Sequence, residues 1–509
     1  MDNLRDVYNS VNARMKTDRR IRGIARKQRI QVLLVELGLT ECINSALSSL
    51  SGGERKKVAL AVQLITEPRI LFCDEPTTGL DSYSAMTVVR TLREVAASGR
   101  IVVCSLHQPA SGLLDVFHEV ILLSGGRVAF QGSSDDAVQF FDSLDLRCPP
   151  TYNSAEFFVS QLSITPGHES ESYQKINLIC EQYEKSKYGN SVSNLIEASL
   201  AGTSAEEVLP AIFLEASSTA YTFKKVRFCT QIRWLTWRTY VDYKRNSSTL
   251  FVRFTTYMFI GLLIATPYMG ILDKEMDQDG IQNMQGLLYL IIVETGFTFN
   301  YAVFYTFPRE LPLLLRDIAS GLYSPAPYYI SKIVVLVPGI IIQPFLYSFL
   351  IFTITGLKGG ILGFFYFTGP VIFCAFSASA LGCFLSASFK SVDTASLFSV
   401  PLDFIALIFS GIYLQLGHLA PSTAWLKYIS QFYFGVEAIS LTQWSQIDHI
   451  NCTDPEEPCI SSGAGVLEKY GYKAGHYYVD LFGLFAIFSI SHFAGFMVIR
   501  HRSRKEAVY

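Results

Sequence analysis

The stretch Leu50-Ser51-Gly52-Gly53-Glu54, followed by Arg69-Ile70-Leu71-Phe72-Cys73-Asp74-Glu75, decides the fold of the front of this chain. The first segment is a glycine-rich turn that opens a helix, where free N–H groups and a serine hydroxyl can hold a phosphate. The second is an apolar strand that ends in two carboxylates. Asp74 can hold Mg²⁺ through water, and Glu75 can orient and deprotonate an attacking water. Together the two segments predict an α/β domain that handles a nucleotide.

Two further motifs follow in the order that such a domain needs. Thr77-Thr78-Gly79-Leu80-Asp81 comes soon after the two carboxylates. The strand Ile101-Val102-Val103-Cys104-Ser105 then precedes His107. The four elements resemble, in this order, the signature motif, Walker B strand, D-loop and switch histidine of an ABC-transporter ATPase.

This resemblance implies a role for each motif residue. In ABC ATPases each ATP lies between the P-loop and Walker B strand of one chain and the signature motif of the other. Ser51, Gly52 and Gly53 would therefore touch the γ-phosphate of an ATP that is bound mainly by a partner chain. The implied roles of the other residues are Mg²⁺ coordination for Asp74, general base for Glu75, a link between the two sites for Asp81 and γ-phosphate sensing for His107.

The phosphate cradle of such a domain is missing from the sequence. A P-loop of the form G-x-x-x-x-G-K-[ST] wraps the β- and γ-phosphates, and no such string occurs in the 509 residues. ABC ATPases carry this loop, and then a glutamine loop, well before the signature motif. About fifty residues precede Leu50, which is too few for both. We therefore expect a partial nucleotide domain that does not bind ATP tightly by itself.

The composition is that of a membrane protein with a soluble part. Hydrophobic residues make up 50% of the chain and charged residues 17%, which is too apolar for an ordinary soluble protein of this length. The net charge of −2 gives no reason to expect a nucleic-acid partner. The ten cysteines form no C-x-x-C pair and no histidine cluster has metal spacing, which argues against a zinc site.

Changes in composition divide the chain into four parts. Residues 1–145 alternate strand and helix patterns and are expected to form the C-terminal part of an ABC nucleotide-binding domain. Residues 146–222 are more polar and indicate a linker with short helices. Residues 223–245 combine basic side chains with tryptophan, which suits an amphipathic connecting helix at the membrane–water interface. Residues 246–509 are expected to form an all-α membrane domain.

Six apolar spans follow, each close to the roughly twenty residues that a bilayer requires. We place them near residues 250–269, 284–304, 329–352, 362–385, 397–416 and 478–499. Basic residues lie before the first span and after the last one. The positive-inside rule therefore puts both termini in the cytoplasm, which an even number of spans allows.

A long external loop is expected between the last two spans, at residues 417–476. It contains Asn451-Cys452-Thr453, an acceptor sequence for N-glycosylation, and a second cysteine, Cys459. Two close cysteines outside the cell can pair, so we expect a Cys452–Cys459 disulfide; the alternative is a bridge to a partner subunit. Asn246-Ser247-Ser248 also fits the acceptor pattern but is expected on the cytoplasmic side, where it would not be used.

A nucleotide domain that precedes six spans and a large last external loop is similar to the White, or G, subfamily of ABC half-transporters. Local matches lie in residues 286–297, 307–310, 321–324, 408–411 and 425–434. The resemblance implies a homo- or heterodimer with another G-subfamily half-transporter, embedded in membrane lipid. It also implies a multi-pass protein, at the plasma membrane, that exports lipids, sterols or other hydrophobic and amphipathic molecules with ATP and Mg²⁺.

The same resemblance assigns residues of the membrane domain. In this family the segment between spans two and three couples the nucleotide domain to the membrane, and here it carries Arg309, Glu310 and Arg316. A solvated loop is the alternative. The expected substrate cavity is formed by Glu294, Phe297, Phe404 and Leu407, below an apolar gate at Ile412 and Tyr413. An ionisable group in mid-span is costly and usually faces a cavity or a partner, whereas the aromatic residues could equally face lipid or pack between helices.

Three functional readings remain open. The first is a transporter subunit that works as half of a dimer. The second is an ATPase-inactive regulatory or dominant-negative partner, which the missing P-loop favours. The third is an incomplete record of an ordinary transporter. A soluble ATPase with the same signature motif is excluded by the six spans.

Overall fold

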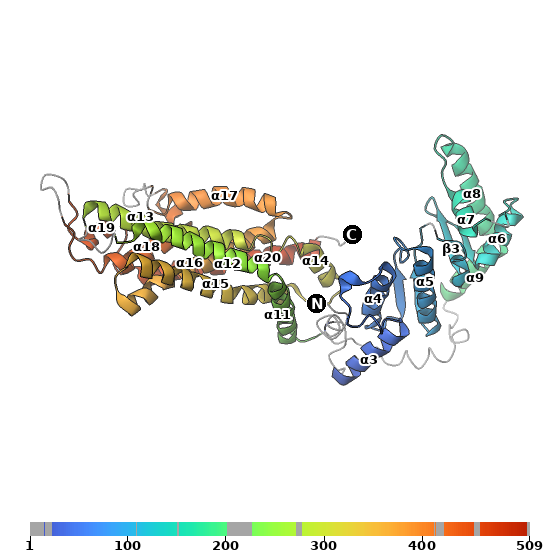
Figure 1. The fold of residues 1–509 in the computed structure, drawn as a ribbon. Helices are drawn as coiled ribbons and strands as arrows, with labels where there is room; N and C mark the ends of the chain where they lie inside the picture. The colour runs from blue at the N-terminus through green and yellow to red at the C-terminus, as the bar shows by residue number, and fades with distance from the viewer. Residues whose placement is uncertain are drawn as a thin grey trace. The chain divides into compact units, whose positions relative to one another are not determined.

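The computed structural model describes residues 15, 23–107, 109–149, 152–200, 226–270, 277–411, 413, 422–451 and 459–505. The chain forms two compact units, residues 1–225 and 226–509. Unit 1 combines helices with short strands, and the described part of unit 2 is helical. Figure 1 shows the order of these elements along the chain.

The acidic motif of unit 1 lies on a pair of parallel strands. β1 (Ile70–Cys73) pairs with β2 (Ile101–Cys104), and their register places Cys73 opposite Cys104. α5 (Ser82–Ala97) connects the two strands, as parallel pairing requires. α3 (Gly23–Glu36) and α4 (Gly52–Leu64) share a hydrophobic core with this βαβ segment. These elements confirm the α/β class that was predicted for the front of the chain.

An antiparallel hairpin follows these elements. β3 (Val120–Ser124) pairs with β4 (Arg127–Gly132). The turn residues Gly125 and Gly126 have φ angles of 57° and 78°, a region where a side chain would be strained. α6 (Ser134–Ser143) comes directly after the hairpin.

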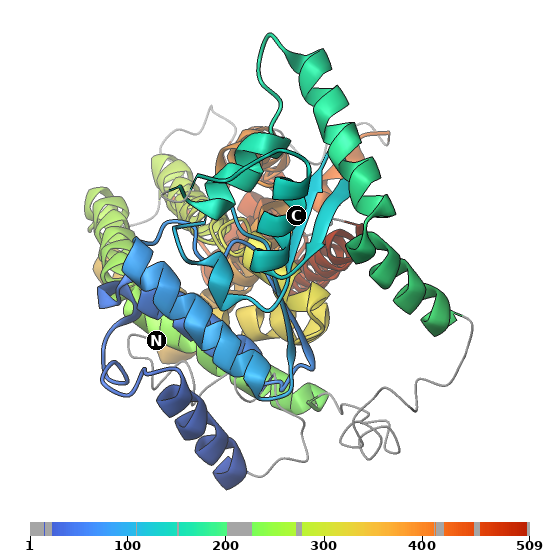
Figure 2. The ribbon, with the colours of Figure 1, turned by 90° about the vertical axis from the view of Figure 1, so that its right-hand side faces the viewer.

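Helices lie in the segment that was expected to be a linker with short helices, residues 146–222. α7 (Ser154–Leu162), α8 (Glu169–Lys185) and α9 (Lys187–Leu200) occupy most of it, and α8 and α9 run one after the other along unit 1 (Figure 2). Side chains of α7 and α8 are buried in one cluster with Phe130 of β4. The abundant Glu and Ser residues of this segment hid the apolar stripes that dock the helices. The rest of the expected linker, residues 201–222, lies outside the described residues.

Unit 2 begins with a basic helix, as predicted, and continues with long apolar helices. Its helices are α11 (Phe228–Arg245), α12 (Ser247–Ala265), α13 (Gln278–Ala302), α14 (Leu311–Ala319), α15 (Pro325–Thr355), α16 (Gly360–Ser388), α17 (Val392–Ile408), α18 (Gln431–Trp444), α19 (Gly463–Lys469) and α20 (Tyr477–Lys505). Four stretches among the described residues are long and apolar enough to cross a membrane, namely Ser247–Tyr268, α15, α16 and α20. α13 and α17 coincide with the other two predicted spans, but neither of them is both long enough and apolar enough to be counted. The predicted number of six spans is therefore not confirmed.

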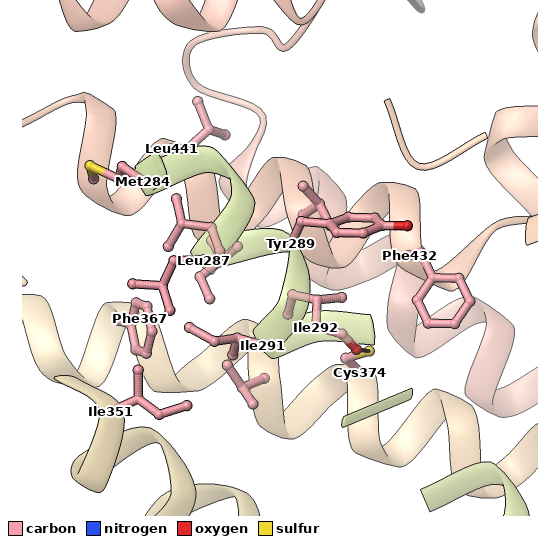
Figure 3. Packing of buried hydrophobic residues seen from close by; sticks show 14 of the residues in the cluster. Met284, Leu287, Tyr289, Ile291, Ile292, Ile351, Phe367, Cys374, Phe432 and Leu441 are labelled. Atoms are coloured by element: carbon pink, nitrogen blue, oxygen red, sulfur yellow. Dashed lines mark hydrogen bonds between the residues drawn. The ribbon is translucent and has the colours of Figure 1, made fainter. Parts of the chain in front are cut away.

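The core of unit 2 is built around α16. This helix packs against α13, α15, α18 and α20. Figure 3 shows the centre of the cluster, where Ile291 and Ile292 of α13 lie near Cys374 and Phe367 of α16. These side chains are all fully buried, so the apolar surface they remove from water or lipid is packed against neighbouring helices.

Part of the segment that was expected to be a long external loop, residues 417–476, is helical. Its residues 431–444 form α18, and nearly all of them are buried in the helix bundle. Some of its polar side chains are paired with neighbouring helices inside the bundle. Gln285 of α13 donates to Ser440 Oγ at 3.0 Å and accepts from Trp444 Nε1 at 2.8 Å. A helix of 14 residues is too short to span a bilayer, which is why hydropathy gave no sign of it.

Two glycines let α13 and α18 approach closely. A Cβ atom at Gly296 of α13 would overlap the ring of Phe432 on α18. A Cβ atom at Gly435 of α18 would lie 2.8 Å from Ile292 Cγ2 on α13. Each helix therefore receives a side chain of the other, in the manner of small-residue contacts between membrane helices.

Candidate functional site

The N-terminus of α4 carries the signature residues Ser51, Gly52 and Gly53. Ser51 is the N-cap, and it forms a capping box with Glu54. The Glu54 amide donates to Ser51 Oγ at 3.3 Å, and the Ser51 amide donates to Glu54 Oε2 at 2.8 Å. The Cys42 thiol donates to Glu54 Oε1 at 3.0 Å, and this bond, followed by those from Ser51, lowers the pKa of Glu54. The capping box fixes the start of the helix and leaves Ser51 and Gly52 exposed.

The D-loop lies directly against the signature glycines. A Cβ atom at Gly52 would lie 3.0 Å from Leu80 Cδ2, and one at Gly53 would lie 3.3 Å from Ser84 Cβ. Asp81 is the N-cap of α5, because its Oδ2 accepts from the Ser84 amide at 3.0 Å. The hydrogen bonds from Ser84 lower the pKa of Asp81. The two glycines thus allow the D-loop to pack closely and leave the helix N-terminus accessible.

Ser105 joins the two carboxylate residues at the end of β1, a contact that the motif reading missed. Its Oγ donates to Asp74 Oδ1 at 2.5 Å and accepts from the Glu75 amide at 2.9 Å. Glu75 has a φ of 43°, a left-handed conformation that is rare for residues other than glycine. The sequence position of Ser105 could have revealed this contact, because the residue directly follows a strand and the carboxyl ends of parallel strands meet at one edge of the sheet.

The side chains of Glu75 and His107 are both exposed. The Thr78 hydroxyl donates to Glu75 Oε2 at 3.0 Å, which orients the expected general base. Lys56 of α4 reaches the Glu75 carbonyl oxygen at 3.4 Å and thereby connects the signature helix to this turn. His107 follows the end of β2, as predicted.

These residues fit one part of an ATP and Mg²⁺ site. An exposed helix N-terminus with two glycines suits a terminal phosphate, and exposed carboxylates at a strand end suit a hydrated Mg²⁺. The sequence has no P-loop to cradle the β- and γ-phosphates. The described residues therefore correspond to three parts of an ATP site: the signature motif, the Mg²⁺ position and the general-base position. The phosphate-binding loop is not among them.

In unit 2 the predicted cavity residues do not form one cluster. Glu294 is half-buried, and its Oε1 accepts from the Thr298 hydroxyl one turn later, at 2.7 Å. The Phe297 ring lies 5.8 Å from the ring of Phe432 on α18. Leu407 packs against the main core, whereas Phe404 is 62% exposed on α17. Phe404 thus presents an apolar surface to lipid or to another chain.

A buried polar cluster next to Phe404 was missed by the sequence reading. Asp403 and Ser399 of α17 and Asn300 of α13 are each at most 1% exposed. The Asn300 amide nitrogen donates to both carboxylate oxygens of Asp403, at 3.2 and 3.0 Å, and the Ser399 hydroxyl donates to Asp403 Oδ2 at 3.0 Å. An aspartate within an apolar helix was the sign that could have found it.

Comparisons with known proteins agree with both halves of this description. Residues 3–78 match a family model described as "ABC transporter", and residues 230–444 match one described as "ABC-2 type transporter". Protein scarlet of Drosophila melanogaster is 34% identical over 501 residues, which cover 97% of this chain and 74% of scarlet. The chain belongs to the G, or White, subfamily of ABC transporters.

Other relatives of this half-transporter give the same assignment. Protein white of Drosophila melanogaster is 30% identical over 94% of this chain and 69% of its own length. The broad substrate specificity ATP-binding cassette transporter ABCG2 of Rattus norvegicus is 28% identical over 84% of this chain and 67% of its own length. The solved structure of cbiO1 from Clostridium perfringens has 24% identity and covers 29% of this chain and 59% of its own, with a TM-score of 0.24, which is too low to support an argument.

The three residues expected to couple the half-transporter's domains differ in their surroundings. Arg309 and Arg316 are exposed beside and on α14. Glu310 is held within unit 2, because Lys332 Nζ lies 2.6 Å from its Oε1 and the Tyr328 hydroxyl donates to its Oε2 at 2.9 Å. Glu310 therefore connects the start of α14 to α15. Of the three residues, the two arginines are the ones whose side chains are exposed and can contact another surface.

The remaining predicted positions are only partly described. Tyr413 is exposed, with its ring 5.9 Å from that of Tyr289, while Ile412 lies outside the described residues. Cys459 is disulfide-bonded. Cys452 lies outside the described residues, so its pairing with Cys459 stays a prediction. Asn451 is half-buried, and its glycosylation also stays a prediction.

Proposed function

We propose that this half-transporter pairs with a second G-subfamily half-transporter and exports a hydrophobic or amphipathic molecule, such as a lipid or sterol, with energy from ATP. The exposed N-terminus of α4 is the observation that supports pairing most directly. It offers a binding surface for a terminal phosphate, yet the sequence supplies no P-loop to hold the rest of the nucleotide. In the subfamily's dimer arrangement, the P-loop of another chain would hold a nucleotide on this surface.

In the proposed dimer, Ser51, Gly52 and Gly53 close over an ATP that the partner holds. Asp81 lies against these glycines through the D-loop and is placed to pass the state of one site to the other. Asp74 would hold hydrated Mg²⁺ and Glu75 would act as the base of a second site, with His107 beside them. Because the 509 residues contain no P-loop, a dimer made with this polypeptide should have one competent site and one incomplete site.

The membrane part of the proposal places six spans at α12, α13, α15, α16, α17 and α20. The basic helix α11 and Arg502, Arg504 and Lys505 at the end of α20 favour a cytoplasmic location for both ends. We place the protein at the plasma membrane, with Asn451 on the outer side. Glu294 and Phe297 on α13, with Phe404 and Leu407 on α17, are proposed to face a substrate path that the second half completes.

A regulatory subunit is the second candidate. Such a subunit would occupy the dimer interface and change the partner's ATPase activity without supporting transport. Transport by the co-expressed pair therefore separates the two candidates.

The test is the ATPase activity of this chain co-expressed with a complete G-subfamily half. Gly52→Asp places a carboxylate against the γ-phosphate, and like charges at close range cost several kcal/mol when water is excluded. We expect this variant to abolish the activity. Gly52→Ala is the matched control, since it adds the same Cβ atom, 3.0 Å from Leu80 Cδ2, without the charge. Glu75→Gln should leave most of the activity, because its site is incomplete.

Two results would count against the proposal. Equal loss of activity in Gly52→Asp and Glu75→Gln would contradict the one-site dimer. Failure of the chain to co-purify with any G-subfamily half would contradict pairing itself.

A further inference from the structure

Three potential metal ligands meet where α18 packs against the start of α20. Glu437 lies on α18, His476 immediately precedes α20, and Asp480 lies in the first turn of α20. One ligand atom from each residue lies within 4.8 Å of the others. The cluster is separate from the nucleotide residues and from the predicted substrate path.

The two carboxylates are buried without enough partners. Glu437 is 0% exposed and Asp480 is 1% exposed. Glu437 Oε1 accepts from the Lys473 amide at 2.9 Å and lies 3.9 Å from His476 Nδ1. Glu437 Oε2 and Asp480 Oδ2 are both buried and have no hydrogen-bond partner among the residues that the structure describes. Buried carboxylate oxygens without a hydrogen-bond partner are costly in a low-dielectric interior, and a cation bound between the two side chains would remove that cost.

The backbone holds the ligands in a suitable arrangement. His476 and Asp480 are four residues apart, and the Asp480 amide donates to the His476 carbonyl at 2.9 Å, so both side chains project from one face of the first helical turn. Glu437 meets them from α18. The His476 side chain is 39% exposed, which gives the cluster a route to solution.

We propose that Glu437, His476 and Asp480 bind one divalent transition-metal ion. Zinc takes nitrogen and oxygen ligands at about 2.0–2.2 Å, so two ligands of one ion are at most about 4.4 Å apart. The three ligand atoms lie within 4.8 Å of one another, which is close to this value. A Ca²⁺ ion would need six to eight oxygen ligands, and an imidazole with two carboxylates suits zinc or a similar ion better.

An ion at this place would have a structural consequence. Its positive charge would balance the two carboxylates, and it would join α18 to α20 at the end of the bundle that also holds α19. The cysteine and histidine spacing of the sequence gave no sign of this cluster, because two of its ligands are carboxylates and one comes from a distant helix.

The experiment uses the full chain, purified in detergent with a tag that contains no histidine. Zinc affinity is measured by competition with a chromophoric chelator, and thermal unfolding is followed with and without ZnCl₂. We expect one bound zinc per chain and a higher unfolding temperature with zinc. His476→Ala should weaken zinc binding about tenfold or more and remove the thermal shift. His449→Ala, which changes an exposed histidine outside the cluster, is the matched control and should bind as the wild type does.

Glu437→Gln supplies the second variant. We expect it to weaken zinc binding as well, and the half-exposed His476 keeps the test valid if Glu437→Gln does not fold. Equal zinc affinity in the wild type and His476→Ala would overturn the proposal. The proposal also fails if zinc leaves the wild-type unfolding temperature unchanged while Glu437→Gln unfolds at a higher temperature than the wild type. That result would indicate that the two carboxylates share a proton and do not bind a metal ion.

Discussion

Replacement of Asn300 by leucine tests the buried polar cluster that joins α13 to α17. The Asn300 amide nitrogen donates to both carboxylate oxygens of Asp403, at 3.2 and 3.0 Å, and to Ser399 Oγ at 3.0 Å. Asn300→Leu removes these bonds and leaves the buried carboxylate with the hydroxyl of Ser399 and with Tyr301 within hydrogen-bonding reach. Unit 2 should therefore become less stable.

The size of the effect follows from the two bonds to the carboxylate. A hydrogen bond to a charged group contributes about 1.5–3 kcal/mol, while hydrogen bonds between membrane helices average about 0.6 kcal/mol and reach about 1.7. We therefore expect a loss of about 2–4 kcal/mol. For a unit of this size, 1 kcal/mol corresponds to roughly 2 °C in unfolding temperature, so the decrease should be about 4–8 °C.

Buried cysteines provide the assay. Cys374 and Cys383 are buried in α16, so a thiol-reactive fluorescent dye reaches them only when unit 2 unfolds. The exposed Cys229 reacts at once and sets the baseline. Ser396→Ala on α17 is the control, because its hydroxyl bonds only within its own helix, to the Val392 carbonyl. It should change the unfolding temperature by less than about 1 °C.

A double-mutant cycle separates the bond from general packing effects. Asp403→Leu alone leaves the Asn300 amide nitrogen with the Ser399 hydroxyl in place of the carboxylate, whereas Asn300→Leu with Asp403→Leu removes both members of the amide–carboxylate pair. The double variant should be more stable than the sum of the single changes by at least about 1 kcal/mol. Additive effects, or an Asn300→Leu variant that unfolds with the wild type, would refute the reasoning.

Three further predictions concern other parts of the chain. Gly435→Ala should destabilise unit 2 by about 1–3 kcal/mol, because the added carbon would lie 2.8 Å from an isoleucine of α13, whereas Gly286→Ala, with its nearest atom at 3.6 Å, should be nearly neutral in the same dye assay. Asn451→Gln should increase gel mobility after expression in a eukaryotic host, and Asn246→Gln should not; the reverse result would invert the proposed topology. Glu54 has a lowered pKa, so its ionised form stabilises the folded state above its unfolded pKa of about 4.3. The wild type should therefore be more stable than Glu54→Gln at neutral pH, and this difference should shrink as the pH falls through the lower, folded pKa. Thermal unfolding of both proteins at a series of pH values measures the difference. A difference that does not change with pH would show that the capping box contributes nothing.

Patterns that are local in sequence predicted much of the fold. The glycine-rich signature turn predicted the helix that follows it, and the structure begins this helix, α4, at Gly52 with a capping box between Ser51 and Glu54. The hairpin around Gly125 and Gly126 was also readable, because these glycines mark a turn between two apolar runs. Apolar length found the long helices of unit 2, although it could not show that α13 and α17 cross a membrane.

Contacts between distant segments were not predictable in the same way. α18 is buried on all sides and has no amphipathic period, and with 14 residues it is shorter than a span, so it was taken for part of a loop. The role of Ser105 depends on the pairing of β1 with β2, which brings it to Asp74 across 31 residues. From the sequence, Phe404 was assigned to an apolar cavity and Asp403 was not singled out, and only the packing of α17 against α13 shows which of these neighbours is buried.

The exchange of side chains between α13 and α18 has a consequence for how unit 2 can move. Gly296 receives Phe432, and Gly435 receives Ile292, so sliding or rotation of either helix would force backbone against a side chain. Packed interfaces of this kind switch as blocks and do not deform gradually. A rearrangement that displaces α18 should therefore carry α13 with it. Spin labels on these two helices should keep one separation through the nucleotide cycle, even if their separation from a label on α17 changes.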